Sequence, residues 1–263
     1  MREECIYAML RTIKGLSNVF YRFDIQWVHQ PPADPWRHLR LVAFLNHTSL
    51  YEPLFVGGFP NEFIKRIAFK GLMPVADKAT RRPLMGLFFR LVAKNVVSIT
   101  RKNDHTWNRV LSTMKPDTMV IIMPEGRMMR ANGLDKHGQP MTVRGGIADI
   151  VQSIPEGRML LTYSAGLHHV QIPGQRIPKI FKTLLMRLET IDIAKYRNRL
   201  MGRCGPDVGT WNFSHCYLFG ICFLVIVIYL FSDIKNTNFR IKILIGHLRR
   251  LWIHRQLKAA HRH

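Results

Sequence analysis

Apolar residues fall into short runs along the chain, and these runs alternate with amphipathic segments. The runs predict strands at about 40–46, 66–69, 95–100, 118–123, 159–163 and 180–188. Apolar residues at helical spacing predict a short helix from Ser49 and helices at about 83–91, 104–114 and 146–153. This alternation is typical of an α/β domain. Between 124 and 144 the chain is polar and contains glycines, which favours a functional loop.

An amphipathic helix is predicted within residues 1–23 from apolar residues at near-helical spacing: Ile6, Leu10, Ile13, Leu16 and Phe20. Such a helix either lies on a membrane surface or packs on the domain, and the spacing favours neither alternative. A polar connection that contains prolines follows over 24–40. No secretory signal pattern is present in these residues, because two acids stand at the start and no long apolar region follows.

Composition changes near residue 204. From Cys216 to Phe231 the sequence has no charged residue, and uncharged residues from Trp211 bring the run to about the 20 residues that a bilayer span needs. A hydrophobic helix in the membrane is the first interpretation, and a buried core helix is the alternative. The basic residues after Lys235 would face the cytoplasm by the positive-inside rule, so a single span would put the preceding domain on the other side. A re-entrant or interfacial helix avoids that conflict, and the topology stays open.

These changes divide the chain into three parts. They are an N-terminal segment and linker at 1–37, a central domain at 38–203, and a hydrophobic helix with a basic tail at 204–263.

Charge narrows the choice of partners. The 263 residues include 39 Lys and Arg against 17 Asp and Glu, a net charge of +22, while 47% of the residues are hydrophobic. A chain of this composition forms a real core and suits a polyanionic partner: nucleic acid, an anionic membrane or a phosphorylated substrate. Its four cysteines are scattered without metal-ligand spacing, which favours reduced thiols in a cytosol-facing protein.

A histidine and a carboxylate stand at the end of one predicted strand. The apolar run from Leu41 to Leu45 leads directly into the segment Asn46-His47-Thr48-Ser49-Leu50-Tyr51-Glu52. Histidine has an ordinary pKa near neutrality, so His47 suits a general base and Glu52 suits the group that orients its ring. The stretch from Ser49 to Glu52 also matches a capping box, in which Glu52 serves only a helix start. The pair alone leaves both interpretations open.

Three further blocks carry basic residues or glycines at element ends. Met123-Pro124-Glu125-Gly126-Arg127 follows a buried strand, where an arginine can bind a phosphate, although a surface turn with a local ion pair also fits. Arg101 follows another predicted strand, as a basic residue often does. In Arg144-Gly145-Gly146 two glycines precede a helix, which is either an anion site or an ordinary helix start.

Taken in order, these blocks resemble the glycerolipid (lysophospholipid) acyltransferase family of the 1-acylglycerol-3-phosphate acyltransferase type, over roughly residues 38–190. The resemblance implies a mixed central sheet flanked by helices, to which the apolar patterns outside it add an N-terminal amphipathic helix and a C-terminal hydrophobic helix. It also implies a general base at His47, oriented by Glu52. The implied substrate-binding residues are Arg101, Glu125, Gly126, Arg127, Arg144 and Gly145.

Two positions depart from the family pattern. Glu52 stands where the family has an aspartate, so its side chain is one methylene longer. The family's fourth block, which has a Val-Pro core, should fall near 158–167, where this chain has Leu160-Leu161-Thr162-Tyr163-Ser164-Ala165-Gly166 without a proline. That block shapes the substrate site, so the acceptor is not fixed by the resemblance.

The first hypothesis is therefore a membrane-associated acyltransferase with its catalytic site facing the cytosol. It would transfer a fatty acyl group from acyl-CoA or acyl-carrier protein to a lysophospholipid, most simply 1-acyl-glycerol-3-phosphate. No metal or bound cofactor is expected, because the thioester is already activated. A catalytically altered lipid-binding member of the same fold is the alternative, prompted by Glu52. A basic nucleic-acid-binding protein is disfavoured, since the basic residues are dispersed and no recognised nucleic-acid-binding motif is present.

Overall fold

The computed structural model describes residues 1–49, 51–81, 89, 94–100, 104–172, 175 and 177–204. The chain divides into two compact units, Met1–Leu218 and Phe219–His263, and all the described residues belong to the first. Of the predicted helix at 83–91, only residue 89 is among the described residues. The apolar run at 211–231 lies wholly outside them.

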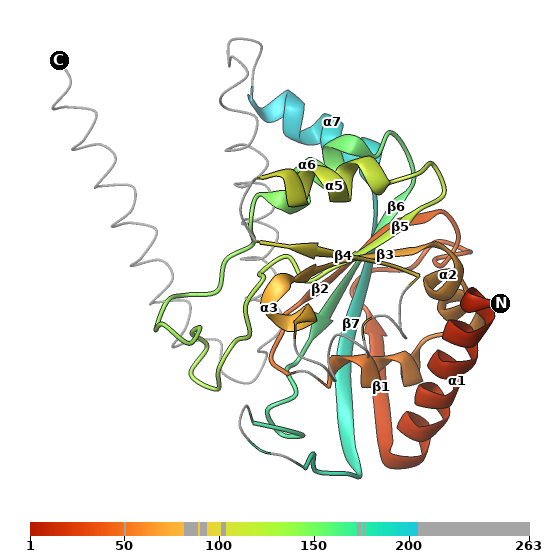
Figure 1. Ribbon diagram of the computed structural model, residues 1–263, viewed down its shortest axis with the longest axis vertical. Coiled ribbons are helices and arrows are strands. Elements are labelled where there is room, and N and C mark those ends of the chain that lie inside the picture. Colours follow the sequence, from red (N-terminus) through yellow and green to blue (C-terminus); the bar gives the residue numbers. More distant parts are fainter. Residues whose placement is uncertain are drawn as a thin grey trace, which may run out of the picture. The chain divides into compact units, whose positions relative to one another are not determined.

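A seven-stranded mixed sheet forms the centre of this unit (Figure 1). Its strands are β1 (Tyr21–Trp27), β2 (Leu39–Leu45), β3 (Gly71–Ala76), β4 (Asn95–Ile99), β5 (Met119–Ile122), β6 (Arg158–Ser164) and β7 (Lys182–Asp192). They lie in the order β1-β7-β6-β2-β5-β3-β4. The five strands from β6 to β4 are parallel to one another, whereas β7 is antiparallel to β6 and parallel to β1. The predicted α/β class with a mixed central sheet is confirmed.

Helices cover both faces of the sheet (Figure 1). They are α1 (Arg2–Phe20), the 3-10 helix η1 (Glu52–Gly58), α2 (Asn61–Lys70), α3 (Asp77–Thr80), α5 (His105–Thr113), α6 (Gly146–Ser153) and α7 (Ile193–Cys204). The helices α1, η1 and α2 pack together on one face, and α5, α6 and α7 lie on the other. Two-sided cover explains why the strands read as continuous apolar runs, since a parallel sheet is buried on both faces.

The centre of the core lies around β2. Leu41, Val42 and Ala43 have no exposed surface, and β2 pairs with β5 on one side and β6 on the other. An aromatic cluster extends the core toward α2, where the ring centroids of Phe59 and Phe63 lie 4.8 Å apart. Three parallel strands therefore end together at one edge of the sheet, supported by rigid packing.

The N-terminal helix packs on the domain. Ile6, Leu10 and Ser17 of α1 are buried, and the first two belong to the main hydrophobic cluster. Packing on the domain is therefore the observed alternative for the buried face of α1. Among the described residues, none of the helices is both long and apolar enough to cross a membrane.

Two sequence-based assignments were wrong. The apolar residues at 66–69 belong to α2 and not to a strand, and β3 follows directly at Gly71. Phe63, Ile64 and Ile67 of α2 are buried at helical spacing, a pattern that a four-residue window cannot distinguish from a buried strand. Part of the predicted polar connection at 24–40 is strand β1, whose partner β7 lies far along the sequence.

Candidate active site

His47 is the second residue after the end of β2, at the edge where β2, β5 and β6 all end. The preceding residue, Asn46, has a left-handed backbone with φ of 61°. Asparagine tolerates this conformation better than most residues. Its side-chain amide also donates to the Ser164 carbonyl at the end of β6, at 3.0 Å. Asn46 thus turns the chain sharply at the end of β2 and ties it to the neighbouring strand.

The predicted contact between His47 and Glu52 is present. The Nδ1 atom of His47 is hydrogen-bonded to Oε2 of Glu52. The Glu52 side chain is 4% exposed and that of His47 is 14% exposed. No hydrogen bond from the described residues involves the other ring nitrogen, Nε2. A buried carboxylate on one nitrogen thus fixes the orientation of the ring and leaves the second nitrogen for chemistry.

The Glu52 side chain also supports the backbone of the histidine segment. While Oε2 contacts His47, Oε1 accepts from the backbone N–H groups of Thr48 at 2.8 Å and Ser49 at 3.3 Å. The capping box that the sequence offered as the alternative is not formed, because η1 begins at Glu52 itself and its N-cap is Tyr51, without a side-chain cap hydrogen bond. Glu52 therefore reaches both the histidine and two backbone donors that precede the helix.

Glu125 holds the backbone of the histidine segment. This residue follows β5 and is 2% exposed. Its two oxygens accept from the N–H of Asn46 and the N–H of His47, each at 3.1 Å. Burial raises the pKa of Glu125, while the two N–H donors act in the opposite direction. The glutamate of the Pro-Glu-Gly-Arg block is thus a positioning residue that joins the ends of β2 and β5.

The loop after β6 supplies a third support that sequence reasoning missed. Leu167 donates its N–H to the Thr48 hydroxyl at 2.7 Å, and the Ser49 hydroxyl donates to Gln171 at 2.8 Å. Thr48, Ser49 and Gln171 are all buried. These contacts connect residues more than a hundred positions apart, and neither Leu167 nor Gln171 lies in a recognisable motif. They hold the segment on the side opposite to β5.

Arg127 is paired with a buried acid. Its guanidinium Nη1 bonds to Oδ2 of Asp135, whose Oδ1 accepts from the N–H groups of His137 at 2.8 Å and Gln139 at 2.9 Å. Arg127 Nε is buried and has no hydrogen-bond partner among the described residues. The pair organises the segment between 127 and 139, and the Arg127 side chain remains 24% exposed. Phosphate binding by Arg127 stays a prediction.

The glycines of the site make room for neighbours. Gly126 has φ of 62°, and a Cβ there would lie 3.2 Å from two atoms of the exposed Arg144 side chain. Arg144 also donates its N–H to the Pro124 carbonyl at 2.9 Å. A Cβ on Gly146 would lie 2.7 Å from Trp107, so this glycine permits α6 to pack on α5. The structure therefore brings the block at 123–127 against the block at 144–146. Gly145, within the second block, is exposed.

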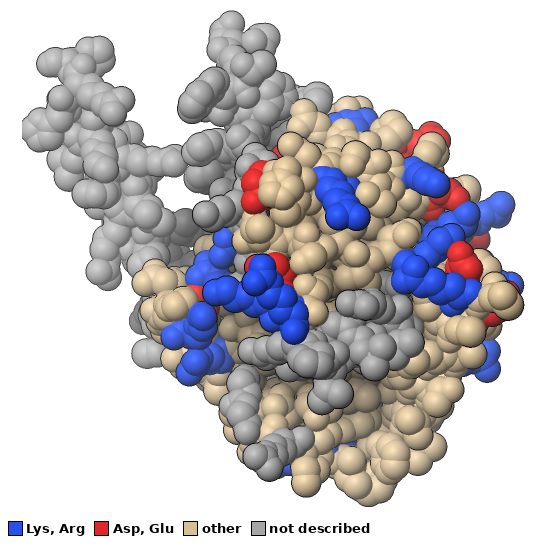
Figure 2. Space-filling model, viewed as in Figure 1, with Lys and Arg blue, Asp and Glu red and all other residues tan. Residues whose placement is uncertain are grey.

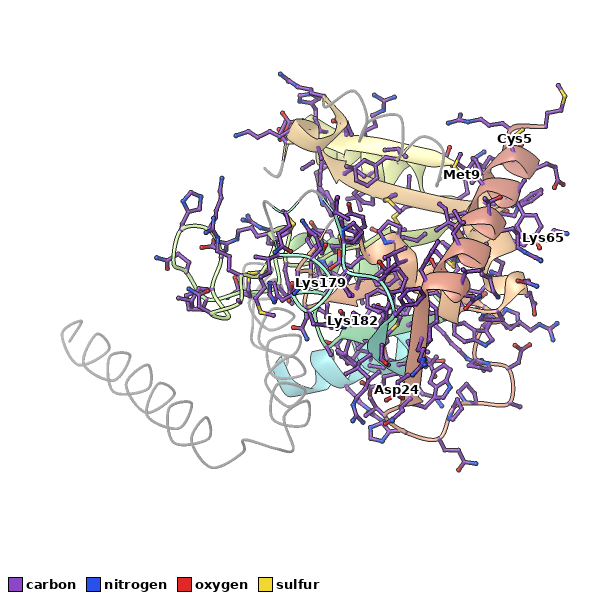
Figure 3. The ribbon with its side chains drawn as sticks, turned by 90° about the horizontal axis from the view of Figure 1, so that it is seen from below. Cys5, Met9, Asp24, Lys65, Lys179 and Lys182 are labelled. Atoms are coloured by element: carbon purple, nitrogen blue, oxygen red, sulfur yellow. The ribbon has the colours of Figure 1, made fainter. Side chains whose placement is uncertain are left out.

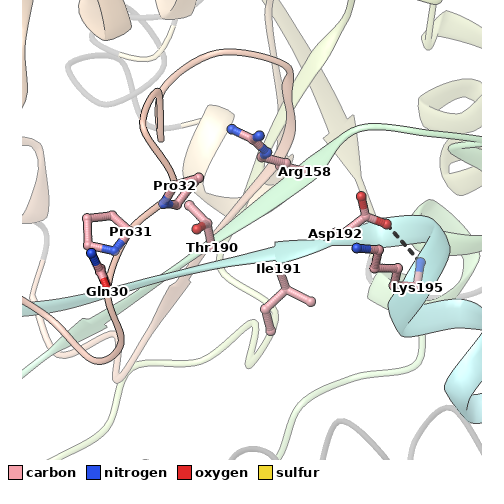
Figure 4. A pocket seen from close by; sticks show the side chains of 8 residues that line it. All are labelled: Gln30, Pro31, Pro32, Arg158, Thr190, Ile191, Asp192 and Lys195. Carbon is pink, nitrogen blue, oxygen red and sulfur yellow. Dashed lines mark hydrogen bonds between the residues drawn. The ribbon is translucent and has the colours of Figure 1, made fainter.

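Arg101 lies outside the described residues, so its predicted role is untested. A cavity of about 410 Å³ lies elsewhere, lined by residues such as Arg158, Asp192 and Lys195 (Figure 4). Arg158 begins β6 and Asp192 ends β7, which places this cavity at the edge of the sheet away from His47.

Comparison with known proteins gives a likeness to solved structures and no match in sequence. No protein-family model matches the sequence, and no curated protein sequence matches it either. The solved structure of the 1-acyl-sn-glycerophosphate (LPA) acyltransferase PlsC from Thermotoga maritima is similar to this chain with a TM-score of 0.49 and 15% sequence identity. The alignment covers 82% of this chain and 78% of the other.

Replacing Glu125 with glutamine tests its support of the histidine segment. The new side chain would present one acceptor and one NH₂ group to two partly buried N–H donors, leaving one donor without a partner. We expect E125Q to lower the free energy of unfolding by about 1–3 kcal/mol in chemical denaturation. The exposed Glu156, changed to glutamine, serves as the control. Equal stability of the two variants would mean that the Glu125 side chain is protonated, because glutamine would then mimic it.

The lowered pKa of Asp135 predicts that the free energy of unfolding depends on pH. Hydrogen bonds from the N–H groups of Gln139 and His137, and from Arg127, lower the pKa of Asp135 from 3.8 to about 2. Because the folded-state pKa lies below the unfolded one, this stabilisation is present above the unfolded pKa and is lost as the pH falls through the folded one. The stability difference between wild type and D135N, measured by urea unfolding, should therefore narrow as the pH falls from about 4 to about 2. A difference that stays constant over this range contradicts the assignment.

Proposed function

We propose that this protein is an O-acyltransferase that moves a fatty acyl group from a thioester to the hydroxyl of a lysophospholipid. The observation that carries the proposal is the ring orientation of His47. A buried glutamate occupies Nδ1, and Nε2 has no partner among the described residues. This is the arrangement by which a histidine serves as general base to a hydroxyl nucleophile.

The reaction follows from that geometry. His47 Nε2 takes the proton of the acceptor hydroxyl as its oxygen attacks the thioester carbonyl, and Glu52 stabilises the imidazolium that forms. The tetrahedral intermediate then collapses, the carbon–sulfur bond breaks, and the leaving thiolate takes the proton from His47. An ester and a free thiol result, and His47 returns to its neutral form. The thioester supplies the activation, so this chemistry needs no metal or cofactor.

The acceptor is inferred from charge. Arg127 and Arg144 lie in the segments that follow β5, and Arg101 follows β4 in the sequence. Arginines suit the phosphate of a lysophospholipid, because a guanidinium can bind two phosphate oxygens at once. We therefore favour 1-acyl-glycerol-3-phosphate as acceptor, with phosphatidic acid as product and acyl-CoA or acyl-carrier protein as donor. A membrane-associated, cytosol-facing enzyme would meet both substrates.

The alternative is a lipid-binding protein of the same fold that has lost the activity. It was prompted by the longer side chain of Glu52. The contact between Glu52 and His47 weighs against it, because the carboxylate reaches Nδ1 while keeping its backbone donors. We find no observation that favours a nucleic-acid-binding protein.

Removing the proposed base should abolish turnover. We expect H47A to lower kcat by about 10²–10⁴-fold in an assay with labelled acyl-CoA and a panel of lysophospholipids. The control is His29→Ala, since the His29 side chain is 77% exposed and lies beyond β1. Equal product from wild type and H47A would rule out His47 as the base.

Two variants of Glu52 separate orientation of the His47 ring from support of the backbone. In E52Q the amide oxygen still accepts from the backbone, but the amide nitrogen opposes Nδ1 and no carboxylate stabilises the imidazolium. We expect E52Q to lose about 10²–10⁴-fold in kcat and only about 1 kcal/mol in stability. The E52D variant keeps the charge and should retain more activity than E52Q. If E52Q and E52D lose activity only in proportion to stability, Glu52 supports the backbone of Thr48 and Ser49 and has no role in orienting the ring.

A further inference from the structure

Exposed apolar side chains are concentrated in two segments. Among the residues that the structure describes, the exposed large apolar side chains other than Met1 and Val28 lie at the end of α1 and around the start of β7. They are Leu16, Val19, Phe20, Ile172, Ile177, Ile180, Phe181 and Leu185. Several are exposed over most of their surface: 66% for Val19, 81% for Ile177 and 70% for Phe181.

The register of β1 against β7 brings the two segments together. Tyr21 pairs with Lys182, and Phe181 donates its N–H to the Phe20 carbonyl at 2.7 Å. The rings of Phe20 and Phe181 lie 6.3 Å apart between centroids. On α1, Leu16 and Val19 stand at i and i+3 beside Phe20 at i+4, so these three share one face. We call the following six residues the apolar patch: Leu16, Val19, Phe20, Ile177, Ile180 and Phe181.

Basic residues predominate around the patch. The sequence has no acidic residue from 5 to 23 or from 157 to 188, and the acids Asp24 and Glu189 stand directly after these two stretches. Arg22, Lys179, Lys182 and Arg187 are exposed in these stretches. Figure 3 shows Lys179 just before β7 and Lys182 at its first residue. The lower part of the face in Figure 2, where α1 ends and β1 and β7 begin, is largely uncharged. The patch is therefore an apolar surface with a basic border.

The direction of β1 and β7 places the patch near the proposed site. Ser164, at the end of β6, pairs with Met186 near the start of β7, and Tyr21 begins β1 beside Lys182. Because β1 and β7 run against the other five strands, they begin at the edge of the sheet where β2 ends at His47. The apolar patch and the histidine therefore lie at the same edge.

We propose that the apolar patch is a docking surface for an anionic lipid bilayer. Apolar side chains of this kind enter the boundary between headgroups and acyl chains, while lysines around them interact with anionic headgroups. A border in which exposed lysines and arginines predominate is complementary to such a membrane. Docking by this surface would also turn His47 toward lipid substrates. That second statement rests on the proposed function, whereas the docking itself does not.

Local probes test this surface in the full-length chain. The four native cysteines are replaced by serine, and a single cysteine at Ile177, Phe181 or Val28 carries the fluorophore NBD. Vesicles consist of phosphatidylcholine with or without phosphatidylglycerol. We expect blue-shifted emission, and quenching by doxyl-labelled lipids, for the probes at 177 and 181 when phosphatidylglycerol is present. The probe at 28, also on an exposed apolar residue but outside the patch, should remain in water.

Each other outcome overturns the proposal. Vesicle-bound protein whose probes at 177 and 181 stay in water would show that another part of the chain binds the membrane. Probes already shielded before vesicles are added would show that the patch is covered, by a second copy if dilution exposes them and by this chain itself if dilution does not. None of these readouts involves acyl transfer, so an inactive protein leaves the test intact.

The basic border is tested by neutralising two lysines. With the probe at 177 in place, K179Q/K182Q should weaken the apparent affinity for vesicles that contain phosphatidylglycerol by roughly tenfold. The matched control is K65Q/K115Q, which removes two exposed lysines outside the patch. Equal affinity losses in the two double variants would mean that net charge alone attracts the protein and would refute a specific border.

Discussion

One buried carboxylate fixes the geometry on which the site depends. Glu125 lies at the end of β5 and accepts the two N–H groups that the sharp turn after β2 leaves without a strand partner. A buried N–H without an acceptor is costly, so this bond both permits the turn and fixes its direction. Because Asn46 adopts a left-handed backbone at this point, His47 faces away from the sheet and toward Glu52.

The neighbouring loops add constraints of a different kind. After β6, Leu167 and Gln171 contact the hydroxyls of Thr48 and Ser49, so the histidine segment is held from both adjacent strands. Arg127 and Asp135 stabilise the long loop after β5, and their ion pair does not hold the histidine segment directly. Rigid support from several elements suits the role proposed for His47, since small displacements of a reacting group lower the rate strongly.

Sequence patterns predicted most of the parallel strands and the contact between His47 and Glu52, because both depend on local order: an apolar run, then a polar motif at its end. They did not predict α2, because its short apolar stretch from Ile67 to Phe69 fits a strand as well as a helix. They missed β1, since its pairing with β7 is set by residues some 160 positions away. The role of Glu125 as an acceptor for backbone N–H groups was also invisible, because a backbone donor carries no sequence signature.

The long sequence separation of these bonds has a consequence for folding. The acceptor for the His47 N–H comes 78 residues later, and the partners of Thr48 and Ser49 come 119 and 122 residues later. Contacts of this kind form only after the intervening chain has closed its loops, so the histidine is placed correctly late in folding. Partial opening of the loop after β5 or β6 would release it while the central strands stay folded. The His47 ring therefore takes its native orientation only when the whole domain has folded.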